Sequence, residues 1–465
     1  MSGGELAPAT AAPAALGPRF RRFLVSAAAA NLGDGLMTVA LMWLASSITR
    51  EPAAIALIGL ANRLPWLLLS LPAGVIVDRV DRRRLVVAMD AVRCATVLLL
   101  GLVVVMVQSD LPSPAALAAG ADAPAAAGLL IGLLALSSLV LGCAEVLRDN
   151  AAQTLLPALV ERPQLEKANA RLWSAEISAN QFVGPPLGGV LVGIAVALPF
   201  LLNAGLLGLS AVLLLGMSGL YRARPAEAPE PVDPGADDAS AVAASLPTAR
   251  SWRADLAEGI TWLWRHRLLR TLALMLGVMN LMGAAAFAAV VLFVQEVLGV
   301  LDGWAFGLVL TGSAIGSVVA GLVSERIVRR LSPGPTLLLA VAGMGLGLAA
   351  AGLSSSPWLF WSIELVTGLT VVLWNVVTVS LRQRIIPDHL LGRVNAAYRF
   401  FGWGMMALGA PLGALVIHLL EPEVGRETAL RAPYLLGAAA YLVMVPIVLT
   451  RLRTVHLRAA EEAAA

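Results

Sequence analysis

The chain contains few charged residues and almost no cysteine. Asp, Glu, Lys and Arg together account for only 14% of its 465 residues, whereas hydrophobic residues account for 58%. A soluble domain needs more polar surface than this, so the composition predicts a membrane protein. The two cysteines, Cys94 and Cys143, both lie in apolar segments, which leaves no basis for a disulfide framework or a thiolate metal site.

Several functional motifs are also missing. There is no Gly-x-x-x-x-Gly-Lys loop to cradle phosphates, which argues against ATP as the energy source. No metal-ligand cluster and no nucleophile constellation stands out, so we expect neither an enzyme nor a bound cofactor. The net charge is only +3, and the basic residues gather at helix ends, which argues against nucleic-acid binding.

What the sequence does contain is a series of long apolar stretches. Crossing about 30 Å of hydrocarbon takes about 20 helical residues. The first stretch contains Asn31 and Asp34 and has no clear cleavage site, so we expect a retained helix rather than a signal peptide. The sequence predicts an all-α membrane protein with twelve transmembrane helices in two pseudo-symmetric six-helix bundles, the spans lying at 23–48, 54–77, 85–107, 127–147, 169–194, 196–220, 268–294, 304–323, 336–353, 358–381, 395–420 and 433–449.

Two segments between the spans differ in composition. Residues 222–251 mix prolines with acids and alanines, a composition that predicts a flexible cytoplasmic linker. Apolar residues recur at helical spacing in 252–267, which predicts an amphipathic helix on the inner membrane surface. The expected organisation is a disordered cytoplasmic tail (1–20), a first bundle (21–221), the linker, the amphipathic helix, a second bundle (268–452) and a cytoplasmic tail (453–465).

The distribution of arginine predicts the orientation. Arginine clusters at 79–84, 326–330 and 382–393 fall on one side of the predicted spans, and the opposite side holds only Arg50, Arg426 and Arg431. Because basic loops stay in the cytoplasm, we expect a multi-pass protein of the cytoplasmic (inner) membrane with both termini inside.

The two halves of the chain share two short patterns. The first closes spans two and eight, and each copy has a glycine, an acid–Arg pair and an arginine cluster. The second pattern is Gln153 to Pro157 and Gln383 to Pro387, so the repeat pairs spans four and ten as well. A parallel repeat of this kind indicates two six-helix units related by an axis along the membrane normal. The residues of the first pattern are Gly74, Asp78, Arg79, Asp81, Arg82 and Arg83, and then Gly321, Glu325, Arg326, Arg329 and Arg330.

These patterns resemble those of the major facilitator superfamily of transporters over nearly the full chain, although Asp81 stands where the commonest signature has glycine. The Asn31 to Gly35 run and the Gln-x-Leu-Leu-Pro loop look most like the exporter branch that includes enterobactin and macrolide efflux proteins. The resemblance implies a gate in which Asp78 lies beside the start of span eleven and Glu325 beside the start of span five. Anchoring of the arginines to anionic lipid is the alternative role.

Charged residues inside the spans should face a cavity or a partner, because a charge in hydrocarbon costs at least about 2.5 kcal/mol. Asp34 lies near the midplane and shares a helix face with Asn31 and Thr38. Arg63 lies at nearly the same depth, so we expect an Asp34–Arg63 contact. Asp34 either takes up a proton or forms a permanent ion pair, and the sequence leaves both open.

Span five carries a second set of polar residues. Glu176 precedes a segment similar to the Gly-Pro-rich motif of antiporters, and it is a further candidate for binding a proton or a cation, or for pairing with an arginine. The glycines and prolines are expected to bend the span and admit close neighbours: Gly184, Pro185, Pro186, Gly188 and Gly189. Further cavity candidates are Asn180, Gln181, Asn280, Glu364 and Asn375, with Trp173, Trp374 and Trp403 as aromatic ones.

The sequence therefore predicts a secondary transporter whose partners are a small-molecule substrate, protons and the lipid bilayer in which it lies. The favoured function is proton-coupled export of a drug, natural product or siderophore by alternating access. A lipid or lysophospholipid translocator and a membrane sensor that has lost transport are the alternatives.

Overall fold

A computed structural model describes residues 16–219, 221 and 252–462; the predicted linker lies outside these residues. The described chain is helical and contains no strand. The all-α prediction is therefore confirmed for this part of the chain. Eleven helical segments are long and apolar enough to cross a membrane.

The first half contains helices of very different length. They are α1 (Pro18–Ile48), α2 (Pro52–Arg79), α3 (Arg82–Val107), α4 (Pro114–Ala118), α5 (Ala127–Leu155), α6 (Leu165–Ile177), the π-helix η3 (Ser178–Val183), α7 (Gly184–Ile194) and α8 (Leu198–Leu215); the short turns η1 (Leu156–Ala158) and η2 (Arg162–Gln164) join α5 to α6.

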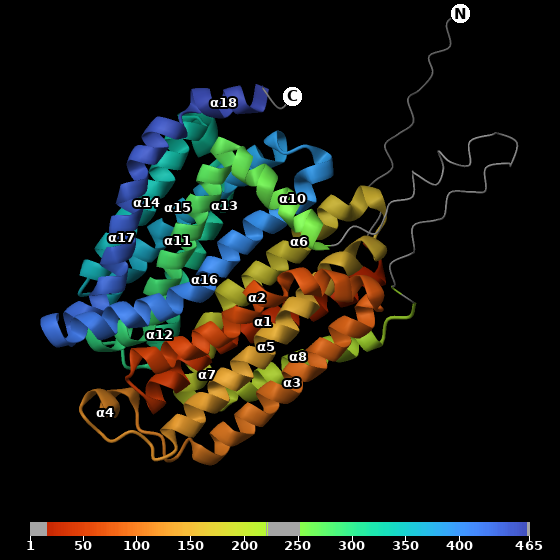
Figure 1. Ribbon diagram of the computed structural model, residues 1–465. Helices are drawn as coiled ribbons and strands as arrows, with labels where there is room; N and C mark the ends of the chain where they lie inside the picture. Colours follow the sequence, from red (N-terminus) through yellow and green to blue (C-terminus); the bar gives the residue numbers. More distant parts are fainter. Residues whose placement is uncertain (1–15, 220, 222–251, 463–465) are drawn as a thin grey trace, which may run out of the picture.

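The second half begins after the linker. Its helices are α10 (Trp252–Arg265), α11 (Arg267–Leu292), the π-helix η4 (Phe293–Val297), α12 (Gly303–Val309), α13 (Thr311–Leu331), α14 (Pro333–Leu353), α15 (Pro357–Ile385), α16 (Asp388–Val424), α17 (Arg426–Arg451) and α18 (Thr454–Glu462). The two halves lie side by side, with α16 running alongside α2 (Figure 1).

The expected span 169–194 is the one that does not form a single long helix. The chain there is helical from Leu165 to Ile194, but it passes from α6 through the π-turns of η3 into α7. The break coincides with Gly184, Pro185 and Pro186, because proline cannot donate a backbone hydrogen bond to the preceding turn. The composite helix at 165–194 is not among the eleven segments of the described chain that are long and apolar enough to cross a membrane, so the predicted count of twelve spans stays a prediction.

The molecule has two ends along the helix axes, which we call the terminal end and the distal end. The terminal end carries the start of α1, the loop between α2 and α3, and α18; the distal end carries α4 and the loop between α1 and α2 (Figure 1). Segments outside the bundles are helical as well: α10 packs on α11 and α16, and α18 packs on α14 and α15. At the junction with α18, the Thr454 hydroxyl accepts a hydrogen bond from the Gly334 amide at 3.1 Å.

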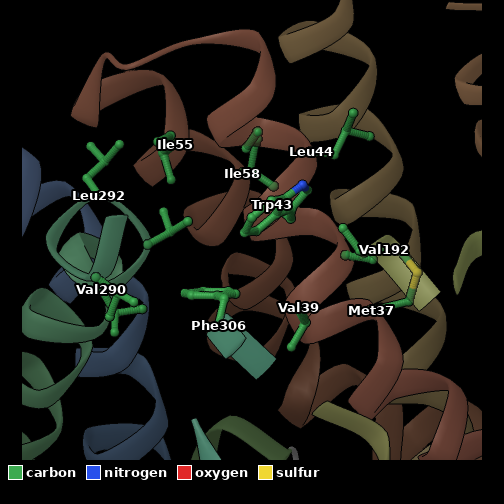
Figure 2. Packing of buried hydrophobic residues seen from close by; sticks show 14 of the residues in the cluster. Met37, Val39, Trp43, Leu44, Ile55, Ile58, Val192, Val290, Leu292 and Phe306 are labelled. Atoms are coloured by element: carbon green, nitrogen blue, oxygen red, sulfur yellow. The ribbon is translucent and has the colours of Figure 1, made fainter. Parts of the chain in front are cut away.

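A cluster of buried apolar residues joins the two halves near the distal end. Trp43 of α1 packs on Phe306 of α12, with 6.0 Å between ring centroids. Figure 2 shows this pair surrounded by side chains from both halves, among them Ile55, Val192 and Val290. The contacting halves thus bury apolar surface together at this end, which stabilises their closed arrangement.

Candidate functional site

A cavity lies between the two halves and has two lobes. The larger, called the N lobe here, has a volume of about 690 Å³ and is lined by Asp34, Arg63 and Glu145 of the first half. The smaller C lobe, of about 330 Å³, is lined by Glu364 and Tyr434 of the second half. The lobes share a wall to which α1, η3, α11 and α13 contribute Thr38, Asn180, Gln181, Gly283, Phe287 and Ser313.

A buried network of charges surrounds the N lobe. Asp34, with 28% of its side chain exposed, pairs with Arg93 of α3, which is 3% exposed. Arg93 also lies 3.6 Å from Asp90. Arg148 of α5 approaches Asp90 at 3.0 Å and Asp149 at 3.2 Å. The network therefore ties α1, α3 and α5 together through Asp90, Arg93 and Arg148, whose side chains have almost no access to water.

Asp90 is the centre of this network and is fully buried. The Ser210 hydroxyl of α8 donates to its second oxygen at 2.6 Å, and Ser26 of α1 lies 2.7 Å from Ser210. A buried carboxylate needs such partners, because an unpaired charge in the interior is strongly destabilising. Asp90 is thus enclosed by its arginine and serine partners, whereas Asp34 borders the cavity.

The network carries one more negative than positive group. Its carboxylates are Asp34, Asp90, Glu145 and Asp149, four in number, and its guanidinium groups are Arg63, Arg93 and Arg148, three in number. Uptake of a single proton would therefore make the formal charges equal, an arrangement that suits a site in low dielectric.

The expected Asp34–Arg63 contact is wrong, since the structure pairs Asp34 with Arg93. Arg63 lines the N lobe together with Glu145. The closest contacts of Arg93 and Arg148 reach between helices, to Asp34 and Asp90. Depth along a helix can be read from sequence, but the helix faces that meet depend on rotation and tilt.

The C lobe contains a carboxylate in very different surroundings. Among the residues that the structure describes, Glu364 has no hydrogen bond and no ion pair. The Tyr434 side chain is 3% exposed and its hydroxyl has no partner there either. Phe287, Phe360 and Met344 supply apolar walls.

At the distal end, charged residues of both halves form a compact group that we call the distal latch. Glu296 of η4 accepts hydrogen bonds from Arg50 Nε and Arg426 Nε, each at 3.0 Å, and Arg50 Nη2 lies 2.6 Å from the same carboxylate as an ion pair. Gln295 donates to Ser46 Oγ at 2.9 Å, and Arg426 donates to the Arg50 carbonyl oxygen. Every hydrogen bond or ion pair between the halves whose two partners are both described lies here.

Glycines allow the backbone of the composite helix to lie close to α1 on one side and to α12 of the second half on the other. A Cβ added at Gly184 would lie 2.5 Å from Gly35 of α1, and one added at Gly189 would lie 2.5 Å from the Gly303 carbonyl oxygen of α12. Gly188 faces Leu36 in the same way, with its added Cβ 2.8 Å from the carbonyl oxygen. The segment after η3 is therefore wedged between α1 and the second half, where larger residues have no room.

The signature at the end of α2 forms a fixed corner. Asp81 caps α3, accepting from the Arg84 amide at 2.8 Å, and accepts from the Tyr221 amide at the same distance. Burial opposes ionisation of Asp81, but these two amides together with the positive charges of Arg83 and Arg84 outweigh it and lower the pKa of the carboxyl. Arg82 donates to the Thr154 carbonyl oxygen at 2.9 Å.

The rest of the signature is more open. The Asp78 side chain lies outside the described residues, so its expected place beside span eleven stays a prediction. Glu325 is 82% exposed and lies 3.6 Å from Arg329 of its own helix, so it makes no close contact with the start of span five in this conformation. A Cβ added at Gly74 or Gly321 would meet no atom within 4 Å. The remaining arginines of the two copies, at positions 79, 83, 326 and 330, are exposed or half-buried.

The other candidates are spread over the molecule. Trp403 stacks on Trp66 of the first half, with 4.8 Å between centroids, and Asn280 donates to the Gly402 carbonyl oxygen. These two residues join helices and do not line either lobe. Trp374 is buried in the core of the second half, so its proposed place in the cavity is wrong. Four more candidates line neither lobe: Asn31, Trp173, Glu176 and Asn375.

Two features of the site were not predicted from the sequence. Arg93 and Glu145 border the N lobe, but neither was among the candidate residues. The distal latch was missed because Arg50, Glu296 and Arg426 are far apart in sequence. One sequence signal could have indicated it. Arginines are rare on the predicted outer side, so the few that occur there are candidates for a specific contact.

Comparison with known proteins agrees with this geometry. The family model for the Major Facilitator Superfamily matches residues 23–410. The multidrug efflux pump Tap of Mycolicibacterium fortuitum is 26% identical over 449 residues, which cover 93% of this chain and 96% of that protein. Tap of Mycobacterium tuberculosis (strain ATCC 25618 / H37Rv) is 26% identical over 463 residues, covering 96% and 94%.

Solved structures show the same fold at low sequence identity. The nucleoside transporter NupG superposes with a TM-score of 0.65 at 11% identity, covering 93% of this chain and 98% of that one. A bacterial homologue of the iron transporter ferroportin, in an inward-facing state, gives a TM-score of 0.63 at 16% identity, covering 92% and 97%. The chain belongs to the Major Facilitator Superfamily and is a multi-pass membrane transporter of small molecules.

Proposed function

We propose that the protein exports drug-like organic molecules from the cytoplasm in exchange for protons. The observation that carries this proposal is the Asp34–Arg93 pair, which lies at the wall of a cavity between two halves of a transporter fold. The full-length similarity to multidrug efflux pumps favours export and a drug-like substrate over other cargo.

The network suggests how a proton would act. Protonation of Asp34 removes its charge and leaves Arg93 with Asp90 as its closest acid at 3.6 Å. Asp90 is already engaged by Arg148 and Ser210. The protonated network therefore favours a different side-chain arrangement, and a proton bound in only one arrangement shifts the balance between the two.

The conformation described here would receive substrate from the terminal end. The distal end is held shut by the latch and by the apolar cluster around Trp43, whereas Glu325 at the terminal end is exposed. We assign the terminal end to the cytoplasm because exposed arginines of both signatures lie there. Alternating access would then consist of breaking the latch and closing the terminal end.

Replacing Asp34 by asparagine tests the proposal. In inverted membrane vesicles with an acidic lumen, we expect the native protein to accumulate a fluorescent drug such as ethidium, and Asp34→Asn to reduce the initial rate more than about tenfold, a barrier change of about 1.4 kcal/mol or more. Asp122→Asn, an exposed loop acid, is the matched control and should transport normally.

Two results would contradict the proposal. One is gradient-driven accumulation by Asp34→Asn at the native rate. The other is native accumulation that persists after the pH gradient is collapsed.

A further inference from the structure

The C lobe contains a carboxylate, that of Glu364, which takes no part in the proton exchange proposed above. Glu364 lies in α15, seven residues after its first residue, or about 10 Å along the helix axis. Its backbone is fixed, because α13 and α15 touch through glycine: a Cβ added at Gly312 would lie 3.2 Å from the Glu364 Cβ. The carboxylate is thus part of a rigid wall and not of a loop.

Arg431, a guanidinium group on the helix that carries Tyr434, is engaged elsewhere. Arg431 lies in α17, less than one turn before Tyr434, but its Nη1 donates to the carbonyl oxygens of Gly352 at 2.7 Å and Ser354 at 2.9 Å. Its Nη2 donates to Glu427 at 2.9 Å. These bonds hold Arg431 at the end of the helix, and Glu364 has no counter-charge among the described residues.

Within the described chain, the Tyr434 hydroxyl adds a second unpartnered polar group to the C lobe. It is buried and without a hydrogen-bond partner among the described residues, and it lines the same lobe as Glu364. By contrast, the neighbouring Tyr441 hydroxyl donates to the Met279 carbonyl oxygen at 3.3 Å. Buried polar atoms normally have partners, so two unpartnered oxygen groups in one lobe call for a ligand that donates hydrogen bonds.

The rest of the lobe indicates the nature of that ligand. Phe287, Phe360, Val290, Met344 and Leu348 give an apolar lining, which suits an apolar body attached to the donor. A divalent metal ion prefers six or more oxygen ligands, and the lobe offers one carboxylate and a few hydroxyl groups. An organic monocation fits better than an inorganic ion.

We propose that the C lobe binds the ammonium group of an amphiphilic cationic substrate, with Glu364 as its counter-ion and the Tyr434 hydroxyl oxygen as a second acceptor. This inference rests on the proposed transport function and adds the charge of the substrate. The N lobe, whose charges are largely paired, then serves the proton, and the C lobe serves the cargo.

Equilibrium binding to the full-length purified protein in detergent tests this inference without any proton gradient. Two probes share the same apolar body and differ at the amine: dansylcadaverine, a primary amine that is cationic at pH 7, and its neutral N-acetyl derivative. We expect the native protein to bind the cation at least about tenfold more tightly, since a buried charge pair contributes at least this much. In Glu364→Gln the two affinities should become equal within about twofold, through weaker binding of the cation.

Three further variants complete the experiment. Glu364→Asp keeps the charge and should keep most of the preference, which separates charge from shape. Tyr434→Phe should weaken binding of the cation by about tenfold, through the loss of one hydrogen bond to a charged group. Glu423→Gln, an exposed acid at the distal end of α16, is the control and should bind both probes normally.

The possible outcomes are distinct from those of the transport test. Equal binding of the two probes by the native protein, or an unchanged preference in Glu364→Gln, overturns the inference even if transport is proton-driven. Loss of the preference in Glu364→Gln supports it even if Asp34→Asn transports normally.

Discussion

The two lobes of the cavity are built on related helices but handle charge in opposite ways. In the N lobe, Asp34 and Asp90 are paired with Arg93 and Arg148. In the C lobe, Glu364 has no such partner among the described residues. Related scaffolds can thus hold a balanced network in one half and a single charge in the other, and we infer a different task for each.

The repeat in the sequence makes this contrast specific. The second shared pattern places Gln153 opposite Gln383, a shift of 230 residues. By the same shift, Glu145 corresponds to Asn375, and Arg148 corresponds to Thr378, so the charges of α5 have no charged counterparts in α15. The carboxylate of α15 occurs instead at another depth, where its counterpart in α5 is Leu134. The two halves therefore differ in the positions of their charged residues, although α5 and α15 are corresponding helices of the repeat.

The largest effect on stability should follow from breaking the balanced network. Arg148→Met leaves Asp90 buried without its closest counter-ion, and we expect a loss of about 3–5 kcal/mol. Glu364→Gln removes a charge that has no partner, so it should leave stability unchanged or increase it. The thermal unfolding temperature of the two variants in one detergent, beside that of the native protein, measures the difference.

A second substitution in the network sharpens this comparison. Arg148→Met combined with Asp90→Asn removes both charges, and most of the lost stability should return because neither ion is then left unpaired. Equal unfolding temperatures for Arg148→Met and Glu364→Gln would contradict the view that charges are paired around the N lobe and unpaired in the C lobe.

A smaller effect is expected at the distal latch, where the charges are partly exposed. Glu296→Gln weakens the contacts of both Arg50 and Arg426, and the cost should be about 1–3 kcal/mol. The distal end should then open more often. In a chain with Cys94 and Cys143 replaced by alanine, a cysteine introduced at the buried Ser47 should react several-fold faster with a membrane-impermeant maleimide.

The matched control for this measurement is Glu427→Gln. Glu427 is exposed and pairs with Arg431 within α17, so it does not join the two halves. Faster labelling in the control, or unchanged labelling in Glu296→Gln, would mean that the latch does not hold the distal end shut.

The fold was largely predictable, and particular residues show why. Long apolar stretches between arginine clusters predict the long helices, because hydrocarbon tolerates little else. A bend of span five was expected at Gly184 and Pro185, but the division of that span into α6, the π-turns of η3 and α7 was not, because glycine and proline also occur within continuous membrane helices. The first turns of α1 precede the expected boundary, since Pro18 begins that helix, and proline is favoured at this position.

The site was predictable only in part. Asp34 and Glu364 could be found because an acid within an apolar stretch needs a cavity or a partner. Their partners could not be found: the sequence favoured Arg63 for Asp34, whereas Arg93 reaches it from a helix whose rotation is set by packing. Trp374 likewise faces the core and not the cavity. Contacts between segments distant in sequence, such as Arg50 with Glu296, depend on that same packing.

The most direct test of the account is whether drug binding displaces a proton from Asp34. Purified protein in weakly buffered detergent, with a pH indicator, should release protons when ethidium is added, up to about one per bound drug. Asp34→Asn should bind the drug and release none. Proton release by Asp34→Asn equal to that of the native protein would contradict the proposal that Asp34 couples the proton to transport.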